Sequence, residues 1–205
     1  GDGYTSVSVH TTDGKWFAAQ GCYDGTTLGS EEGKYFEFSY SSLIGTSAPT
    51  FGVDTSVRMT EEDVGKIDFL CIISNKWHMD ETALYIDDIT IINPYVPDAG
   101  ESTDNNGIVS NFDDVNGRIE TVHDGSYQIV SNGNSVSGNS AEIKIQRPGS
   151  VGDWEGKEYH FYAADENFKW YGDGVKFWAK GDGYTSVSVH TTDGKWFAAQ
   201  GCYDG

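Results

Sequence analysis

The sequence repeats its own first 25 residues at its end. Residues 1–25 and residues 181–205 both read GDGYTSVSVHTTDGKWFAAQGCYDG, so the two copies are offset by 180 residues. Identity over this length does not arise by chance, and such self-similarity has to be settled before a fold is assigned. A period of 180 residues is far longer than a solenoid repeat and matches a domain with its linker. The chain therefore samples slightly more than one period of a natural tandem array or of an engineered duplication.

One polar segment divides this period. Residues 96–107 read VPDAGESTDNNG, a composition typical of linkers. With a linker at 95–107, residues 1–94 are the C-terminal part of one unit and 108–205 the N-terminal part of the next. The two copies then compete for one position. Either the chain closes as a circular permutant with one copy in surplus, or each half completes a neighbouring chain in a strand-swapped polymer.

Short strands separated by turns account for most of the chain. Each copy predicts a β-hairpin, because Val7 and Val9 alternate with polar residues and residues 15–19 return after a Thr-Asp-Gly turn. A helix is predicted to begin after Thr60, with acidic residues in its first turn. Further strands are predicted at residues 34–40, 66–73, 83–92, 127–130, 141–146, 158–162 and 174–179. This pattern predicts an all-β sandwich or barrel.

The charge excludes two classes of partner. The chain has 32 acidic and 13 basic residues, a formal net charge of −19, whereas nucleic acids and anionic membranes require a basic surface. No apolar run approaches the roughly 20 residues that a membrane-spanning helix needs. The acidity serves either solubility or the binding of Ca²⁺ by clustered carboxylates, and composition does not choose between them.

Nothing in the sequence indicates catalysis. The motifs G-x-S-x-G, H-E-x-x-H and C-x-x-C are missing, and in a chain this acidic a pair of carboxylates is uninformative. The histidines, at positions 10, 78, 123, 160 and 190, show no metal-ligand spacing. We therefore predict a non-enzymatic protein.

Two distinct cysteines occur in each period, because Cys202 is the copy of Cys22. A disulfide between Cys22 and Cys71 would form in an oxidising compartment, and two buried thiols are the alternative.

Three motifs resemble a known family. They are NFDD at 111–114, YGDGVKFWAKGDG at 171–183 and YIDDI at 85–89. Read in the order of the natural unit, they resemble the bacterial carbohydrate-binding modules of the β-jelly-roll, galactose-binding-like type, with family 11 nearest. The resemblance implies a two-sheet antiparallel jelly roll, here circularly permuted or strand-swapped, and a secreted or cell-surface, extracellular location.

The family also implies a structural calcium ion near the first and last strands of the unit. Those strands carry two aspartate pairs, and their pairing would bring four carboxylates together, at a cost that Ca²⁺ would remove. The alternative is that the aspartates face solvent on opposite sides of their strands. The implied ligands are Asp87, Asp88, Asp113 and Asp114.

A glycan would need flat aromatic faces next to carboxylates, amides or arginine. The alternative for each aromatic residue is a place in the core, and Phe177 and Trp178 are expected to divide between the core and the opposite face. The carbohydrate-binding candidates are Trp16, Tyr23, Tyr40, Arg58, Trp77 and His78, with Trp154 in a glycine-rich loop.

Two functions follow. The motifs favour a module that binds a plant-type polysaccharide such as a β-glucan. The perfect repetition favours a structural unit of an extracellular fibre or adhesin, assembled with copies of itself through the duplicated hairpin.

Overall fold

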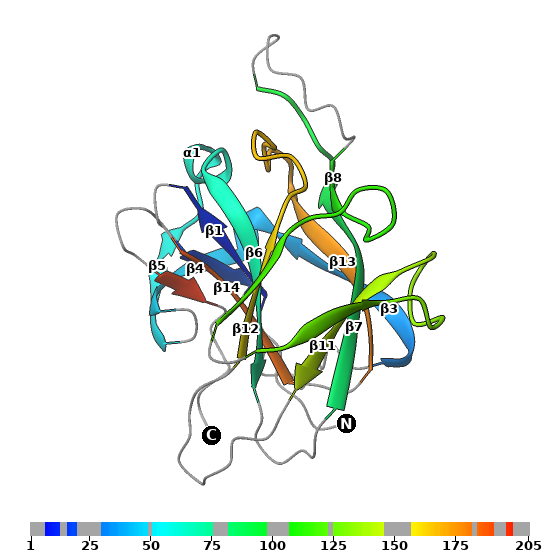
Figure 1. The fold of residues 1–205 in the computed structure, drawn as a ribbon. Coiled ribbons are helices and arrows are strands. Elements are labelled where there is room, and N and C mark those ends of the chain that lie inside the picture. Colours follow the sequence, from blue (N-terminus) through cyan, green and yellow to red (C-terminus); the bar gives the residue numbers. More distant parts are fainter. Residues whose placement is uncertain are drawn as a thin grey trace, which may run out of the picture.

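The computed structural model describes ten ranges of the chain: residues 7–12, 16–19, 30–48, 51–75, 82–97, 107–122, 125–145, 157–181, 184–190 and 196–198. Side chains are described for residues 9–12, 32–45, 56–72, 83–97, 107–122, 125–144 and 158–181. In these ranges all strand pairs are antiparallel, which confirms the predicted all-β fold (Figure 1).

The first sheet has nine strands within the described residues, in the order β1-β2-β4-β15-β14-β6-β12-β9, with β5 paired to β4. Its strands are β1 (Val7–Thr11), β2 (Trp16–Ala19), β4 (Leu43–Ala48), β5 (Phe51–Arg58), β6 (Ile67–Asn75), β9 (Ile119–Val122), β12 (Lys157–Tyr162), β14 (Tyr184–His190) and β15 (Trp196–Ala198).

The second sheet has six strands in the same ranges, in the order β10-β11-β7-β13-β3, with β8 paired to β7. Its strands are β3 (Ser30–Ser39), β7 (Thr82–Ile92), β8 (Ile108–Ser110), β10 (Tyr127–Val130), β11 (Ser140–Ile145) and β13 (Gly174–Gly181). Figure 1 shows β3, β7, β11 and β13 on one side of the molecule and β4, β5, β6 and β14 on the other.

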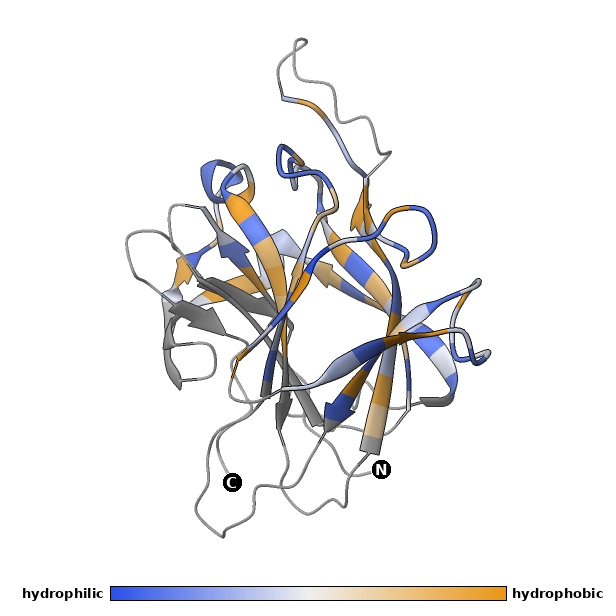
Figure 2. Cartoon of the chain, in the orientation of Figure 1, coloured by the Kyte–Doolittle hydropathy of each residue, from blue (hydrophilic) through white to orange (hydrophobic). Residues whose placement is uncertain are grey.

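The core lies between the two sheets. Ile72 of β6, Ile86 of β7, Ile143 of β11 and Phe177 of β13 are all fully buried and belong to one cluster. Figure 2 shows hydrophobic bands between hydrophilic ones along the strands, and mainly hydrophilic residues in the coloured loops. Burial of apolar surface of this kind is the main favourable term in folding.

Phe177 and Trp178 divide between two faces, as predicted. Phe177 is part of the core cluster, whereas the Trp178 ring lies against Gly33 on the other face of the second sheet. A Cβ atom at Gly33 would lie 2.0 Å from that ring, and the residue has a φ of +76°. Both features require glycine at this position.

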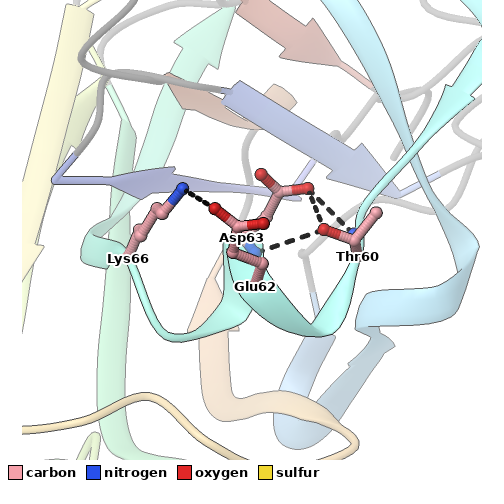
Figure 3. A network of polar contacts seen from close by, with 4 residues as sticks. All are labelled: Thr60, Glu62, Asp63 and Lys66. Carbon is pink, nitrogen blue, oxygen red and sulfur yellow. Dashed lines mark hydrogen bonds and ion pairs between the residues drawn. The ribbon is translucent and has the colours of Figure 1, made fainter.

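The predicted helix begins directly after Thr60, as expected from the sequence. Helix α1 (Glu61–Val64) has Thr60 as its N-cap, and the Asp63 amide donates to the Thr60 hydroxyl while the Thr60 amide donates to Asp63 (Figure 3). This reciprocal pair is a capping box. Lys66 forms an ion pair with Glu62 one turn away, over 2.6 Å (Figure 3). The only other helical segment in the described residues is the 3-10 turn η2 (Tyr40–Ser42).

The two copies of the duplicated segment pair with the same strands, β6 and β4, at a place that we call the hairpin position, and they also pair with each other through Ser8 and Ser188. Val7 of β1 and its copy Val187 of β14 both pair with Ile72 of β6. Strand β1 pairs with the part of β6 between Ile67 and Ile72, and β14 pairs with the part between Ile72 and Asn75. The second strands of the copies likewise share a register on β4, where Phe17 pairs with Gly45 and Trp196 with Thr46. Each copy therefore supplies part of one β-hairpin between β6 and β4.

The strands that flank the linker pair with each other. Ile89 of β7 pairs with Ser110 of β8, and Thr90 pairs with Ile108. This pairing brings the motifs YIDDI and NFDD to the same part of the second sheet, because each motif lies in or directly after one of these strands.

Candidate functional site

Most of the predicted carbohydrate-binding residues lie outside the described part of the structure. Trp16 lies in β2, but its side chain is outside that part, as are Tyr23, Trp77, His78 and Trp154. Tyr40 is 3 % exposed and packs in the hydrophobic core, so its ring face is not offered to solvent. Arg58 is exposed at the end of β5.

Two of the four predicted calcium ligands hold the same loop, residues 131–139. Asp87 is 1 % exposed and accepts a hydrogen bond from the Val136 amide over 2.7 Å. Asp113 accepts one from the Asn139 amide over 2.8 Å and one from the Ser137 hydroxyl over 3.1 Å. Asp87 and Asp113 are therefore joined through the loop that connects β10 and β11.

The other two aspartates have different partners. Asp88 accepts a hydrogen bond from the Tyr35 hydroxyl over 2.5 Å, and Asp114 accepts one from the Asn111 amide side chain over 2.7 Å. Within the described residues, the four carboxylates form no group of three whose ligand atoms lie within 4.8 Å of one another. The calcium ion, with Asp87, Asp88, Asp113 and Asp114 as its ligands, stays a prediction.

The protonation of Asp87 is shifted by its surroundings. Burial raises the pKa of this carboxyl from 3.8 to about 6, although the amides of Val136 and Asp88 act in the opposite direction. Burial of this kind disfavours the charged form of a carboxyl. Oxygen ligands of this type suit Ca²⁺, which would also neutralise the buried charge.

A row of rings lies on the face of the first sheet opposite to that of Leu70 and Ile72, and two of these rings, His10 and Phe69, are buried. In β6, Phe69 and Cys71 lie on the face of the strand opposite to Leu70 and Ile72, although all four side chains are buried and belong to the core cluster. His10 of β1 and Tyr162 of β12 are the direct neighbours of Phe69 across the sheet. The rings of His10 and His160 stack on Phe69, each with a centroid distance of 4.2 Å. We call His10, Phe69, His160 and Tyr162 the outer-face row.

Charged side chains surround the Tyr162 end of this row. The guanidinium of Arg118 lies 3.6 Å from the centre of the Tyr162 ring, and the Tyr162 hydroxyl donates to Glu120 over 2.8 Å. Arg118 and Glu120 also form an ion pair, and their side chains are 55 % and 50 % exposed. At the other end, His10 contacts the carboxylate of Asp68.

This end of the row combines the groups that grip a sugar, namely an aromatic ring, a guanidinium and a carboxylate. Burial, followed by the charge of Asp68, raises the pKa of the Tyr162 phenol, so its proton remains available for donation. No motif in the sequence indicated Tyr162, Arg118 or Glu120 as binding residues. Their signal was the period-two alternation of polar and apolar residues in β9 and β12.

The fold defines the class of protein only as an antiparallel, all-β sandwich. The comparisons with family models, with curated proteins and with solved structures give no match. Within the described ranges, no helix has the length and hydrophobicity required to cross a membrane.

Proposed function

We propose that the protein is a non-catalytic module of a secreted bacterial protein and binds a plant-type polysaccharide such as a β-glucan. The observation that carries this proposal is the Tyr162 end of the outer-face row. There an aromatic ring, the Arg118 guanidinium and the Glu120 carboxylate lie together on a sheet surface. A sugar could bond through its hydroxyl groups to the exposed Arg118 and Glu120 side chains. Displacement of the guanidinium from the Tyr162 ring would open that ring face to the C–H face of the sugar.

Affinity electrophoresis through gels that contain soluble β-glucan or xylan tests the proposal. We expect at least one polymer to retard the chain, and Tyr162→Ala to weaken that retardation about tenfold, which corresponds to roughly 1.4 kcal/mol of binding free energy. Arg118→Ala should act in the same direction, because it removes the donor beside the ring.

Tyr127→Ala is the matched control, because Tyr127 is a tyrosine of the second sheet and is 42 % exposed. It should migrate like the unaltered chain in every gel. Unchanged migration of the unaltered protein on all polymers would remove the carbohydrate proposal, as would equal losses from Tyr127→Ala and Tyr162→Ala.

The second candidate function is a structural unit of an extracellular fibre or adhesin. The shared register of Val7 and Val187 on Ile72 favours it. Because both copies fit the same hairpin position, a copy from one chain can occupy that position in the next. Exchange of identical elements between protomers is a known route to oligomers.

Light scattering tests the second candidate. We expect the full chain to associate in a concentration-dependent manner, since it carries two hairpins for one position. A chain that ends at Lys180 carries one hairpin for one position and should associate less. An oligomeric state that does not change on this truncation would argue against self-assembly through the duplicated segment.

A further inference from the structure

A thiol, a carboxylate and an imidazole converge on the outer face of β6 and β12. Glu158 and His160 are two residues apart in β12 and therefore point to the same side of the sheet. Cys71 lies directly opposite His160 on β6. One ligand atom from each of the three residues lies within 4.8 Å of the other two, and no other group in the described residues meets this condition.

These three side chains are shielded from solvent. Cys71 is a fully buried thiol, and the side chains of His160 and Glu158 are 12 % and 14 % exposed. The His160 ring is held at two points: its Nε2 atom lies 3.1 Å from Glu158 Oε2, and its face stacks on Phe69 with an interplanar angle of 12°. The ring orientation is thus fixed by the protein, as it is in sites where surrounding groups orient a metal ligand.

We propose that Cys71, Glu158 and His160 bind a zinc ion. Sulfur, imidazole and carboxylate ligands together favour Zn²⁺ over Ca²⁺ or Mg²⁺, which prefer oxygen alone. Tetrahedral zinc with bonds of roughly 2.0–2.3 Å needs ligand atoms about 3.3–3.8 Å apart. The His160 Nε2–Glu158 Oε2 distance of 3.1 Å is already close to this range, so an approach of the Cys71 thiol by about 1 Å would meet the requirement.

Binding converts the Cys71 thiol to a zinc-bound thiolate and releases one proton to solvent. With three protein ligands, the fourth position remains for water or for a ligand atom from outside. The ion would link β6 to β12 beside the His160 ring of the outer-face row. This site differs from the predicted calcium site in place and in ligands. It does not depend on carbohydrate binding.

The spacing of the histidines in the sequence does not indicate the group formed by Cys71, Glu158 and His160. No histidine has a second histidine or a cysteine at a standard ligand spacing, which is why no metal spacing was recognised. The signal was Glu158-x-His160 in a strand, where a spacing of two places both side chains on one face. The third ligand is distant in sequence and becomes adjacent only through the pairing of β6 with β12.

Titration of the chelator-treated full chain with Zn²⁺ and with Co²⁺ tests the proposal. We expect one Zn²⁺ per chain at this site, in competition with a chromogenic zinc indicator. Cobalt should give a thiolate-to-metal charge-transfer band in the near ultraviolet. Cys71→Ser should abolish that band, and Cys71→Ser and His160→Gln should each weaken zinc binding at least about 100-fold, since even loss of an outer-shell partner costs 10–100-fold.

His10→Gln is the matched control, because His10 stacks on the other face of Phe69 with the same centroid distance of 4.2 Å. It should retain full zinc affinity. As a second measurement, mass spectrometry after brief alkylation should show that Zn²⁺ protects Cys71. A cobalt band that persists in Cys71→Ser, equal losses in the two histidine variants, or alkylation of Cys71 that is indifferent to zinc would overturn the proposal.

Discussion

Two valines that are each dispensable alone should be essential together. Val9 is fully buried and pairs with Leu70 of β6. We expect Val9→Asp alone to lower the free energy of unfolding by less than about 1 kcal/mol, whereas an unpaired carboxylate in a core normally costs about 3–5 kcal/mol. The reason is that Val187 already pairs with Ile72. Extension of that ladder by two residues places Val189, the copy of Val9, opposite Leu70.

In the double variant, neither copy of the hairpin can replace the other. With Val9→Asp and Val189→Asp together, either copy would carry a carboxylate into the core, and the loss should reach about 3–5 kcal/mol. Such a loss is a large part of the stability of a typical domain. Urea denaturation of the unaltered chain, the two single variants and the double variant measures the coupling free energy between the two sites directly.

Val109→Asp is the matched control, because Val109 is also fully buried but occurs only once in the chain. It should cost about 3–5 kcal/mol by itself. Additive losses from the two duplicated positions, or a Val9→Asp chain as unstable as Val109→Asp, would mean that the second copy cannot replace the first.

The hairpin position illustrates what could be predicted from the sequence. The identity of the two ends predicted that they compete for one place, and the alternation around Val7 predicted that the place is in a sheet. The neighbouring strands on which both copies pair could not be derived from that pattern. Strand order depends on long-range packing, which local periodicity does not encode.

Strands β4 and β5 were not predicted, for a local reason. The segment 43–48 reads LIGTSA and the segment 51–58 reads FGVDTSVR, and each carries a glycine where an alternating strand would carry a side chain. Glycine weakens a strand and indicates irregular pairing. The register does shift between Ile44 and Gly45. Neighbouring strands hold these segments in the sheet despite their glycines.

The candidate site could likewise be predicted only in part from the sequence. The motifs YIDDI and NFDD indicated where the aspartates lie, and β7 does pair with β8. Their partners in loop 131–139 could not be predicted, because a glycine- and serine-rich loop carries no periodic signal. Similarly, Tyr162 and Arg118 are far apart in sequence, and only the pairing of β9 with β12 brings them together.

In the presence of EDTA, Asp87 should make the protein less stable as the pH rises from about 4 to about 6. Its pKa is raised from 3.8 to about 6 in the folded state. The folded chain therefore binds this proton more tightly than the unfolded chain, and the stabilisation is complete below the unfolded pKa and lost as the pH passes the folded one. A shift of about two pKa units corresponds to on the order of 3 kcal/mol.

Asp87→Asn should remove this dependence. The asparagine side chain does not titrate. It offers one hydrogen-bond acceptor fewer to the backbone amides of Val136 and Asp88, and this loss lowers the stability equally at every pH. The difference in unfolding free energy between the unaltered chain and Asp87→Asn should therefore fall by on the order of 3 kcal/mol between pH 4 and pH 7. Urea denaturation at a series of pH values measures it.

Asp114→Asn is the control from the same acidic group. A hydrogen bond from Asn111 lowers the pKa of Asp114, so its small contribution runs the other way and is lost as the pH falls. A pH-independent difference for Asp87→Asn, or the same trend in Asp114→Asn, would contradict the assignment to Asp87.

Calcium should offset most of this loss of stability at pH 7 in the unaltered chain. An ion bound to the ionised Asp87 would stabilise the folded state at pH 7 by mass action, by about 2.7 kcal/mol at 100 times its Kd. Below the pKa of about 6, protons compete with the ion for the same carboxyl oxygens. The melting temperature at pH 7 should thus rise with calcium in the unaltered chain and much less in Asp87→Asn. A melting temperature that is indifferent to both calcium and EDTA would leave Asp87 and Asp113 as loop anchors alone, because their hydrogen bonds to residues 136–139 need no ion.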